Sequence, residues 1–344
     1  MGKVVLVTGV SRRLAGRFVQ RVQCGPDVDR VIAVDAVPPA CRLGDAEFLR
    51  VDRQGADYAD VLAEHGVDTV VHLAVDGGAT VPHRGRAAVK EDNVIGTMRL
   101  LGACQRTPTL RRLVVRSSTL VYGGAPTDPA VCTESTAPRE FPGDGFARDM
   151  AEIEGYVRGF ARRRPEVAVC VLRFAHILGR HTDSLLGAYF RLPVLPTVLG
   201  HDPRLQFVHE DDAVAALCLA AGEPRPGTRN VGTFNVAGDG VVVLSQAARR
   251  LGRPTVPLLR PALGWLGTVL HSIGVTDLSP EQVSLLTYGR VVHTGRMREV
   301  LGFTPAYTTS ETFADFVRGQ PPGLLPPESL ARAVDRIEEA VHGG

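Results

Sequence analysis

Hydroxyl side chains follow directly on an apolar run in the middle of the chain. Residues 113–123 read Leu-Val-Val-Arg-Ser-Ser-Thr-Leu-Val-Tyr-Gly, which is typical of a buried strand that ends in a turn. A serine hydroxyl can donate a hydrogen bond to a ketone oxygen, but it is a poor proton source near neutral pH. Carbonyl chemistry at this strand would therefore need a proton from another group.

The N-terminal residues have the order of a unit that binds a dinucleotide. An apolar run over residues 3–8 precedes Gly9, a stretch with helical spacing covers residues 14–22, and a second apolar run ends at Asp35. Strand, glycine turn, helix, strand and acid form the dinucleotide-binding βαβ pattern. In that pattern the helix N-terminus meets a pyrophosphate, and the acid accepts hydrogen bonds from the adenosine ribose.

Later segments match one protein family in order. They resemble the motifs V-I-H-L-A, N-V-x-G-T, S-S-x-x-V-Y-G, L-R-x-x-N-x-x-G and F-V-H-V-D-D-V of the extended short-chain dehydrogenase/reductases, which are related to NAD-dependent epimerases and dehydratases. The matching segments are residues 70–74, 93–97, 117–123, 172–179 and 207–213. The resemblance spans residues 4–215. It implies an α/β fold: a Rossmann-type, doubly wound parallel sheet with a smaller C-terminal substrate-binding lobe.

The resemblance also implies a cofactor site. The expected cofactor-binding residues are Gly9, Ser11, Arg12, Arg13, Leu14, Asp35, Asp52, Arg53, Leu73, Ala74, Val75, Asn93, Ser117 and Phe174. The glycine pattern is degenerate, because Arg12 replaces its second glycine and Ala15 its third. A guanidinium at 12 or 13 favours the 2′-phosphate of NADPH, whereas Asp35 favours NADH. We expect NADPH, with NADH also able to bind; an ordinary αβ turn is the alternative interpretation of this loop.

The Tyr-x-x-x-Lys helix of the family has lost both of its defining residues. Residues 146–152 read Phe-Ala-Arg-Asp-Met-Ala-Glu, so Phe146 replaces the tyrosine and Met150 the lysine. In the complete family site the tyrosine moves the substrate proton, the lysine lowers the pKa of the tyrosine, and a Ser or Thr orients the substrate oxygen. Ser118 keeps the orienting position, with Thr119 beside it. Either the proton takes another route, or the chemistry has been lost.

Two other side chains, His176 and Tyr189, are candidates for this site, and a third, Asp149, is not. His176 stands where the family has an Asn that contacts substrate, so it is expected to donate a proton, to contact an aromatic ligand, or simply to fill space. Tyr189 belongs to the presumed lobe and is a candidate for the substrate pocket. Asp149 is expected to be solvated.

The missing pair suggests a particular substrate class. A polyphenolic ketone carries an acidic hydroxyl beside its carbonyl and can supply its own proton, while Phe146 and Met150 line an apolar slot for a flat ring system. The chain resembles an actinobacterial branch of the family that includes angucyclinone ketoreductases without Tyr and Lys. This implies NAD(P)H-dependent reduction of an aromatic polyketide ketone in antibiotic biosynthesis. Two alternatives remain: a catalytically inactive dinucleotide sensor or scaffold, and a sugar-nucleotide epimerase or dehydratase.

Composition narrows the possible partners and the compartment. The 344-residue chain has a formal net charge of +2 and no long basic run, so no nucleic-acid partner is expected. The longest apolar run is too short to span a bilayer, and no membrane partner is expected. The six cysteines show neither C-x-x-C pairs nor metal-ligand spacing. We expect reduced thiols, no bound metal and a cytoplasmic location.

Three units are expected along the chain. Residues 1–175 form the dinucleotide-binding domain, with returning segments near 207–236. Residues 176–206 and 237–318 form the substrate-binding lobe, including a helix over 280–286. Residues 319–344 contain a Pro/Gly-rich linker and a C-terminal helix.

Overall fold

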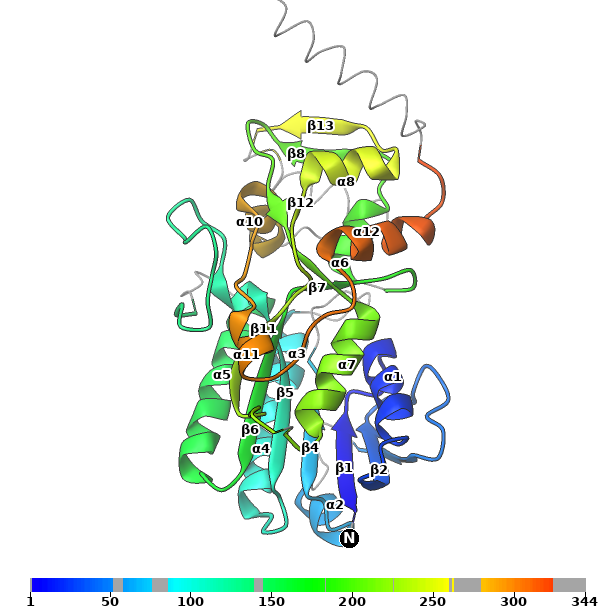
Figure 1. The fold of residues 1–344 in the computed structure, drawn as a ribbon, viewed down its shortest axis with the longest axis vertical. Helices are drawn as coiled ribbons and strands as arrows, with labels where there is room; N and C mark the ends of the chain where they lie inside the picture. Colours follow the sequence, from blue (N-terminus) through cyan, green and yellow to red (C-terminus); the bar gives the residue numbers. More distant parts are fainter. Residues whose placement is uncertain are drawn as a thin grey trace, which may run out of the picture.

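Seven parallel strands form the central sheet of the molecule, which is a computed structural model that describes residues 2–51, 58–75, 86–138, 145–182, 184–224, 226–259, 262 and 280–323. The strand order is β11-β6-β5-β4-β1-β2-β3 (Figure 1). The strands are β1 (Lys3–Thr8), β2 (Val28–Asp35), β3 (Glu47–Arg50), β4 (Thr69–His72), β5 (Arg112–Ser118), β6 (Ala168–Phe174) and β11 (Gly232–Val236).

The central strands are apolar because helices cover both faces of the sheet. In β1, Val5, Leu6 and Val7 are all at most 1 % exposed, since β2 and β4 flank this strand on its two edges. Helices α1 (Arg13–Val22) and α7 (Glu210–Ala221) pack together on one face. Helices α2 (Tyr58–Glu64), α4 (Gly96–Arg106) and α5 (Phe146–Arg163) cover the other.

A second layer of elements lies beyond the carboxyl ends of the strands (Figure 1). It has its own aromatic core, in which Phe190 packs edge-on against Phe207 and Phe313. Its elements are β7 (His176–Leu178), α6 (Leu185–Phe190), β8 (Leu195–Val198), β9 (Arg204–Leu205), β10 (Phe207–His209), β12 (Val242–Val243), α8 (Leu244–Leu251), β13 (Thr255–Leu258), α10 (Pro280–Tyr288) and α12 (Thr309–Arg318).

The predicted fold class is confirmed: a doubly wound parallel sheet with a smaller lobe over its carboxyl edge. The strand order reverses between β1 and β4, and ligands of such sheets bind in the crevice outside the carboxyl ends at that point. The helix predicted over 280–286 is α10. The predicted helix at the C-terminus, over 328–341, lies outside the described residues.

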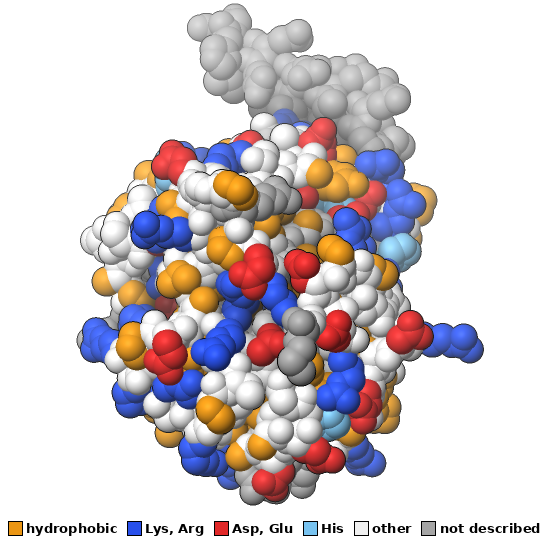
Figure 2. Space-filling model, turned by 60° about the horizontal axis from the view of Figure 1, so that its bottom comes forward, with side chains coloured by type: hydrophobic (Ala, Val, Ile, Leu, Met, Phe, Trp, Pro, Cys, Tyr) orange, Lys and Arg blue, Asp and Glu red, His pale blue; other side chains and the backbone are white. Residues whose placement is uncertain are grey.

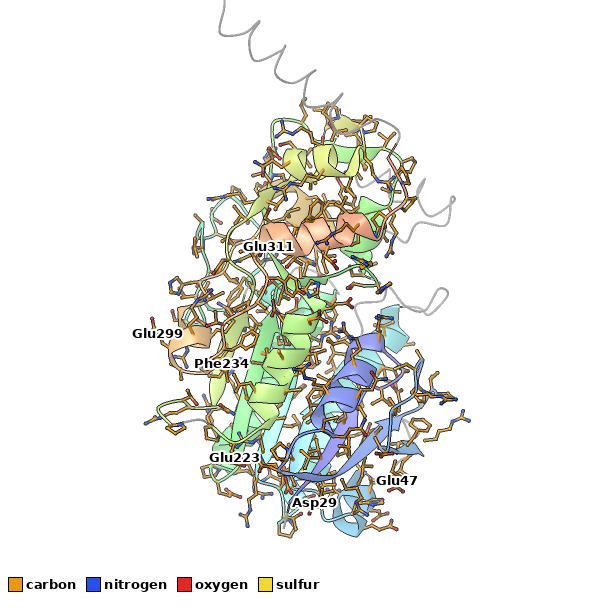
Figure 3. The ribbon with its side chains drawn as sticks, turned by 45° about the vertical axis from the view of Figure 1, so that its right-hand side comes forward. Asp29, Glu47, Glu223, Phe234, Glu299 and Glu311 are labelled. Atoms are coloured by element: carbon orange, nitrogen blue, oxygen red, sulfur yellow. The ribbon has the colours of Figure 1, made fainter. Side chains whose placement is uncertain are left out.

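The surface at the amino ends of the strands carries both charge signs, with basic and acidic side chains interspersed (Figure 2). Glu223 lies at this end, near Asp29 and far from Glu311 of the lobe (Figure 3). Its carboxylate forms ion pairs with Lys3 (2.9 Å) and Arg112 (3.5 Å). Lys3 is therefore held at the edge of the sheet opposite the crevice.

Two kinds of feature are absent from the described residues. None of the helices in the described ranges combines the length and apolarity that crossing a bilayer requires. The same ranges contain no group of three or more His, Cys, Asp or Glu side chains arranged to hold a metal ion.

Candidate functional site

The glycine turn after β1 packs directly on the end of β4. Gly9 has φ +82°, and a Cβ there would lie 2.6 Å from the Ala74 backbone, so only glycine fits. Thr8 Oγ1 accepts hydrogen bonds from the backbone N–H groups of Leu73 (3.2 Å) and Ala74 (3.3 Å). His72 Nδ1 contacts the same hydroxyl at 2.8 Å. The structure thus brings together the two backbone segments that the sequence assigned to the cofactor.

Asp35 is fixed at the end of β2, beside this turn. Its carboxylate is 5 % exposed and accepts hydrogen bonds from Ser11 N (2.9 Å) and Ala36 N (2.8 Å). Both bonds hold the carboxylate in place at the mouth of the crevice. In the dinucleotide-binding pattern, the acid at this position accepts the hydroxyl groups of an adenosine ribose.

The two neighbouring arginines make contacts at other elements. Arg12 Nη1 donates to the Val75 carbonyl at 2.8 Å, at the end of β4. Arg13 Nε lies 3.7 Å from Glu210 Oε2, at the start of α7. The NADPH hypothesis relied on guanidinium groups placed for a 2′-phosphate, and neither of these two contacts provides that placement. Asp52 and Arg53 lie outside the described residues.

Ser117 and Ser118 face opposite sides of β5, because successive side chains in a strand alternate. Ser118 is partly exposed, and its Oγ accepts a hydrogen bond from Leu120 N (3.2 Å) at the start of the turn η2 (Thr119–Tyr122). Ser117 is 2 % exposed and donates to Glu154 Oε1 at 2.7 Å. The expectation that the Ser117 side chain binds the cofactor is therefore corrected: it bonds to α5. Thr119 is also buried, at 3 % exposure.

A buried polar network that the sequence did not reveal lies behind these serines. Arg173 donates to both carboxylate oxygens of Glu154 (2.8 and 2.6 Å) and to Tyr122 Oη (2.7 Å), which in turn donates to Asn235 Oδ1 (2.6 Å). Burial lowers the pKa of Arg173, but the bonds and charge of Glu154 outweigh it, and the net pKa is raised. The network ties α5, β6, η2 and β11 together beneath Ser118.

The positions of the missing Tyr and Lys are apolar. Phe146 is the first residue of α5 and packs, partly exposed, against a hydrophobic cluster that contains Met150. Met150 is only 1 % exposed, so it belongs to the core of the domain. Ala147 N donates to Glu281 Oε1 of α10 at 3.0 Å. The lobe thus caps the start of α5 next to Phe146.

Asp149 is buried, not solvated as expected. It is 0 % exposed, and its Oδ2 accepts a hydrogen bond from Asn93 Nδ2 at 3.1 Å. Asn93 lies in η1 (Glu91–Ile95), a single π-helical turn between α3 (Arg86–Lys90) and α4. Because Asn93 is 1 % exposed and bonds to Asp149, its side chain joins two helices, and its predicted cofactor contact has no support here.

His176 and Arg290 lie beyond the turn that follows Ser118. His176 Nε2 is enclosed and has no hydrogen-bond partner in the structure, and burial, with a smaller effect of the Arg290 charge, lowers the pKa of His176 to about 3. Arg290 Nε donates to the Gly123 carbonyl at 2.7 Å, while its Nη1 is buried and unpartnered. His176 is therefore neutral near pH 7, which argues against proton donation, the first of its three expected roles, and is consistent with ligand contact or space filling.

Tyr189 is a core residue of the lobe. It is 2 % exposed, its hydroxyl donates to the Pro196 carbonyl at 2.9 Å, and its ring packs on Phe190. Its predicted place in the substrate pocket is corrected accordingly. Phe174, at the end of β6, is 2 % exposed and packs in the cluster formed with α1 and α7, whereas Leu14 is partly exposed.

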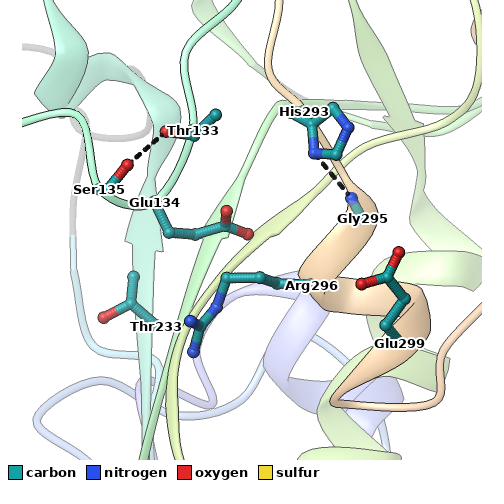
Figure 4. A pocket seen from close by; sticks show the side chains of 8 residues that line it. All are labelled: Thr133, Glu134, Ser135, Thr233, His293, Gly295, Arg296 and Glu299. Atoms are coloured by element: carbon teal, nitrogen blue, oxygen red, sulfur yellow. Dashed lines mark hydrogen bonds between the residues drawn. The ribbon is translucent and has the colours of Figure 1, made fainter.

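A pocket of about 510 Å³ lies at the β11 edge of the sheet, away from the residues expected to act (Figure 4). Glu134 connects it with the buried network, because Glu134 Oε1 accepts a hydrogen bond from Asn235 N at 2.8 Å. Its lining residues are Thr133, Glu134, Ser135, Thr233, His293, Gly295, Arg296 and Glu299.

Protein relatives of this chain include both bacterial and human sequences. An uncharacterised protein of Mycobacterium tuberculosis, Rv0501, is 45 % identical over 330 residues, which cover 94 % of this chain and 85 % of that protein. Human short-chain dehydrogenase/reductase family 42E member 1 is 28 % identical over 232 residues, or 63 % of this chain and 58 % of the human protein.

Solved structures share the fold. MoeE5 in complex with UDP-glucuronic acid and NAD superimposes with a TM-score of 0.69 at 23 % identity, covering 92 % of this chain and 98 % of MoeE5. UDP-glucose 4-epimerase from Thermotoga maritima, with UDP-glucose, also has a TM-score of 0.69, at 18 % identity and the same coverage of each chain.

The family model for the NAD dependent epimerase/dehydratase family matches residues 5–237. This span contains the glycine turn, Asp35, Ser118 and the altered start of α5. The chain belongs to the NAD-dependent epimerase/dehydratase family of extended short-chain dehydrogenase/reductases.

Proposed function

We propose that this protein binds NAD(H) in the β1–β4 crevice and catalyses hydride transfer at a substrate carbonyl that Ser118 holds, without the Tyr–Lys pair. The observation that carries the proposal is the contrast between two neighbouring elements. The partly exposed Ser118 hydroxyl remains at the carboxyl end of β5, whereas Phe146 and Met150 make the start of α5 apolar. When bound, the nicotinamide would supply or accept the hydride.

NAD(H) fits the residues at the crevice better than NADPH. Asp35 is buried and held by backbone N–H groups, so its negative charge would lie against a 2′-phosphate. The preference for NADPH inferred from Arg12 and Arg13 competes with this proposal. Titration of the wild type and of Asp35→Asn with NADH and NADPH distinguishes the two hypotheses. If Asp35 repels the 2′-phosphate, Asp35→Asn should strengthen the binding of NADPH and not that of NADH.

The substrate is proposed to carry an anionic or oxygen-rich group beyond its carbonyl. His176 Nε2 and Arg290 Nη1 are buried polar atoms without partners, and leaving such groups unpaired costs about 1–3 kcal/mol each. A ligand oxygen that reached either atom would remove part of that cost. An aromatic polyketide ketone with phenolic hydroxyl groups meets this requirement, and the resemblance in sequence to angucyclinone ketoreductases without Tyr and Lys suggests the same class.

The proton is proposed to come from the substrate. Ser118 Oγ accepts from Leu120 N, so its own proton can be donated to the carbonyl oxygen, which polarises the bond. In the reducing direction the carbonyl carbon gains the hydride, and the oxygen takes a proton from an adjacent acidic hydroxyl. That hydroxyl is then reprotonated by water. The neutral His176 does not contribute an acidic proton.

Sugar-nucleotide epimerisation or dehydration is the second candidate, and the family match and the ligands of MoeE5 favour it. Phosphate oxygens of a nucleotide would also suit Arg290. Both reactions remove a proton from a sugar hydroxyl, however, and Phe146 offers no base for that step. A dinucleotide-binding protein without catalysis is the third candidate.

One set of assays separates the three. NADH oxidation is followed with an aromatic ketone that bears a neighbouring hydroxyl and with the same ketone lacking it, and UDP-glucose is incubated with NAD. Turnover of the hydroxylated ketone supports the proposal. Conversion of UDP-glucose favours the epimerase, and cofactor binding without turnover of any of these substrates favours the non-catalytic role.

A further inference from the structure

Two arginine side chains converge on one carbonyl oxygen at the end of β4. Arg12 comes from the turn after β1 and Arg116 from β5, and the Nη1 atom of each donates to Val75 O, at 2.8 Å and 3.3 Å. Both side chains are partly buried. Because they share one acceptor, the two guanidinium charges lie side by side. Arg116 was not among the predicted site residues, although a charged residue two positions before Ser118 in an apolar strand is a signal for it.

This convergence lies at the switch point of the sheet. β1 and β4 are neighbours where the strand order reverses, and the Gly9 and Ala74 backbones are in contact there. A ligand of a doubly wound sheet lies across this crevice, with its charged middle over the turn that leads into α1. Arg12 and Arg116 therefore place positive charge where the phosphates of a dinucleotide would cross.

The dinucleotide-binding pattern has its second glycine at the position of Arg12. A glycine lets the phosphates approach the backbone closely, because it has no side chain. Here the backbone of Arg12 is extended (φ −102°, ψ 144°) and requires no glycine. The N–H groups of Ser11 and Arg12 are already bonded to Asp35 Oδ2 (2.9 Å) and Gly9 O (3.2 Å). Guanidinium groups can supply the donors that these two N–H groups do not, and their hydrogen bonds to phosphate oxygens are charge-assisted.

We propose that Arg12 and Arg116 bind the pyrophosphate of the dinucleotide, an inference that rests on the dinucleotide binding proposed above. The pyrophosphate is common to NADH and NADPH, so both cofactors lose the same factor of affinity when either arginine is removed. Contact of Arg12 with a 2′-phosphate, the hypothesis drawn from the sequence, would instead change the ratio of the two affinities.

The test is calorimetric titration of the wild type, Arg12→Ala, Arg116→Ala and Arg12→Lys with NADH, NADPH, ADP-ribose and adenosine. Each alanine variant should weaken the three pyrophosphate ligands about 10- to 100-fold, the value of one charge-assisted hydrogen bond, and leave adenosine unchanged. Arg12→Lys keeps the charge and should retain most of the affinity. Arg21→Ala is the matched control, because Arg21 is exposed in the last turn of the same helix. Thermal unfolding verifies that each variant is folded.

Three results would overturn the inference while dinucleotide binding stands: unchanged affinities in both alanine variants, a loss confined to NADPH, or tighter binding by Arg12→Ala, which would make Arg12 an obstruction. Inorganic pyrophosphate distinguishes this failure from failure of the proposed function. If the wild type binds pyrophosphate but no dinucleotide, and Arg12→Ala binds neither, the arginine site stands and the proposed function fails. If the wild type binds neither ligand, both are wrong.

Discussion

Restoring the family's lysine at position 150 is expected to destabilise the protein without activating it. Met150 is 1 % exposed and shares its hydrophobic cluster with Ile153 and Val157 on the same helix. A lysine placed there must either bury its ammonium group in this cluster or force the start of α5 to move. The double variant Phe146→Tyr/Met150→Lys should therefore unfold more easily than the wild type and turn over no faster.

The magnitude follows from two terms. Burying a methionine side chain contributes about 1.5–3 kcal/mol, of which the lysine methylenes keep a part. An ammonium group buried without its hydrogen bonds adds about 1–3 kcal/mol. We therefore expect the free energy of unfolding to fall by about 3 kcal/mol for Met150→Lys. Phe146 is partly exposed, so the hydroxyl of Phe146→Tyr can reach water and should change stability by less than about 0.5 kcal/mol.

Denaturant unfolding monitored by circular dichroism measures the free energy of unfolding, and NADH oxidation in the presence of a ketone measures turnover. Met150→Leu is the matched control, because a volume-conserving apolar exchange costs less than about 1.5 kcal/mol. The reasoning fails if Met150→Lys is as stable as the wild type. It fails more seriously if the double variant gains turnover by orders of magnitude, since the chain would then be a decayed Tyr–Lys reductase.

Four further substitutions test other contacts of the candidate site. Ser118→Ala should lower turnover about tenfold through one lost polarising hydrogen bond, whereas Ser117→Ala should reduce stability and leave turnover nearly unchanged, as steady-state kinetics and unfolding would show. Glu154→Gln breaks the buried pair with Arg173 and should cost about 3–5 kcal/mol in denaturant unfolding. The pKa of His176, lowered by burial to about 3, means that between about pH 6.5 and 3 the unfolded chain binds one more proton than the folded one. The free energy of unfolding should therefore decrease as the pH is lowered through this range, by up to about 1.4 kcal/mol per pH unit. Unfolding measured at several pH values should show a smaller slope for His176→Asn.

The parts of the fold that sequence predicted correctly around the candidate site are local in the chain. Residues 3–8 form an uninterrupted apolar run, and such a run predicts a strand that helices cover on both faces. Gly9 follows one such run and Asp35 ends another. Their positions at the carboxyl edge of the sheet therefore follow from the strand direction alone. The contact between Gly9 and Ala74 required only that β1 and β4 be neighbours.

The errors concern side chains whose partners are distant in the chain. Asp149 was expected in solvent because a helical aspartate usually is, but its partner Asn93 is 56 residues away and no pattern joins them. Tyr189 is amphipathic, and only the packing of the lobe decides that its hydroxyl reaches the Pro196 carbonyl. Ser117 was grouped with Ser118, although the two-residue period of a strand already places them on opposite faces.

The loss of the tyrosine sets a quantitative demand on the substrate. A positioned general acid contributes about 10²- to 10⁴-fold to a proton-coupled step. Ser118 is a poor proton source near neutral pH and His176 is neutral there, so the proposed mechanism takes the acid from the substrate. A ketone that lacks the neighbouring hydroxyl should consequently react about 10²- to 10⁴-fold more slowly than its hydroxylated parent, in single-turnover measurements of NADH oxidation at saturating substrate. Equal rates for the two ketones would show that the protein provides the proton itself, and a substrate-assisted route would then be wrong.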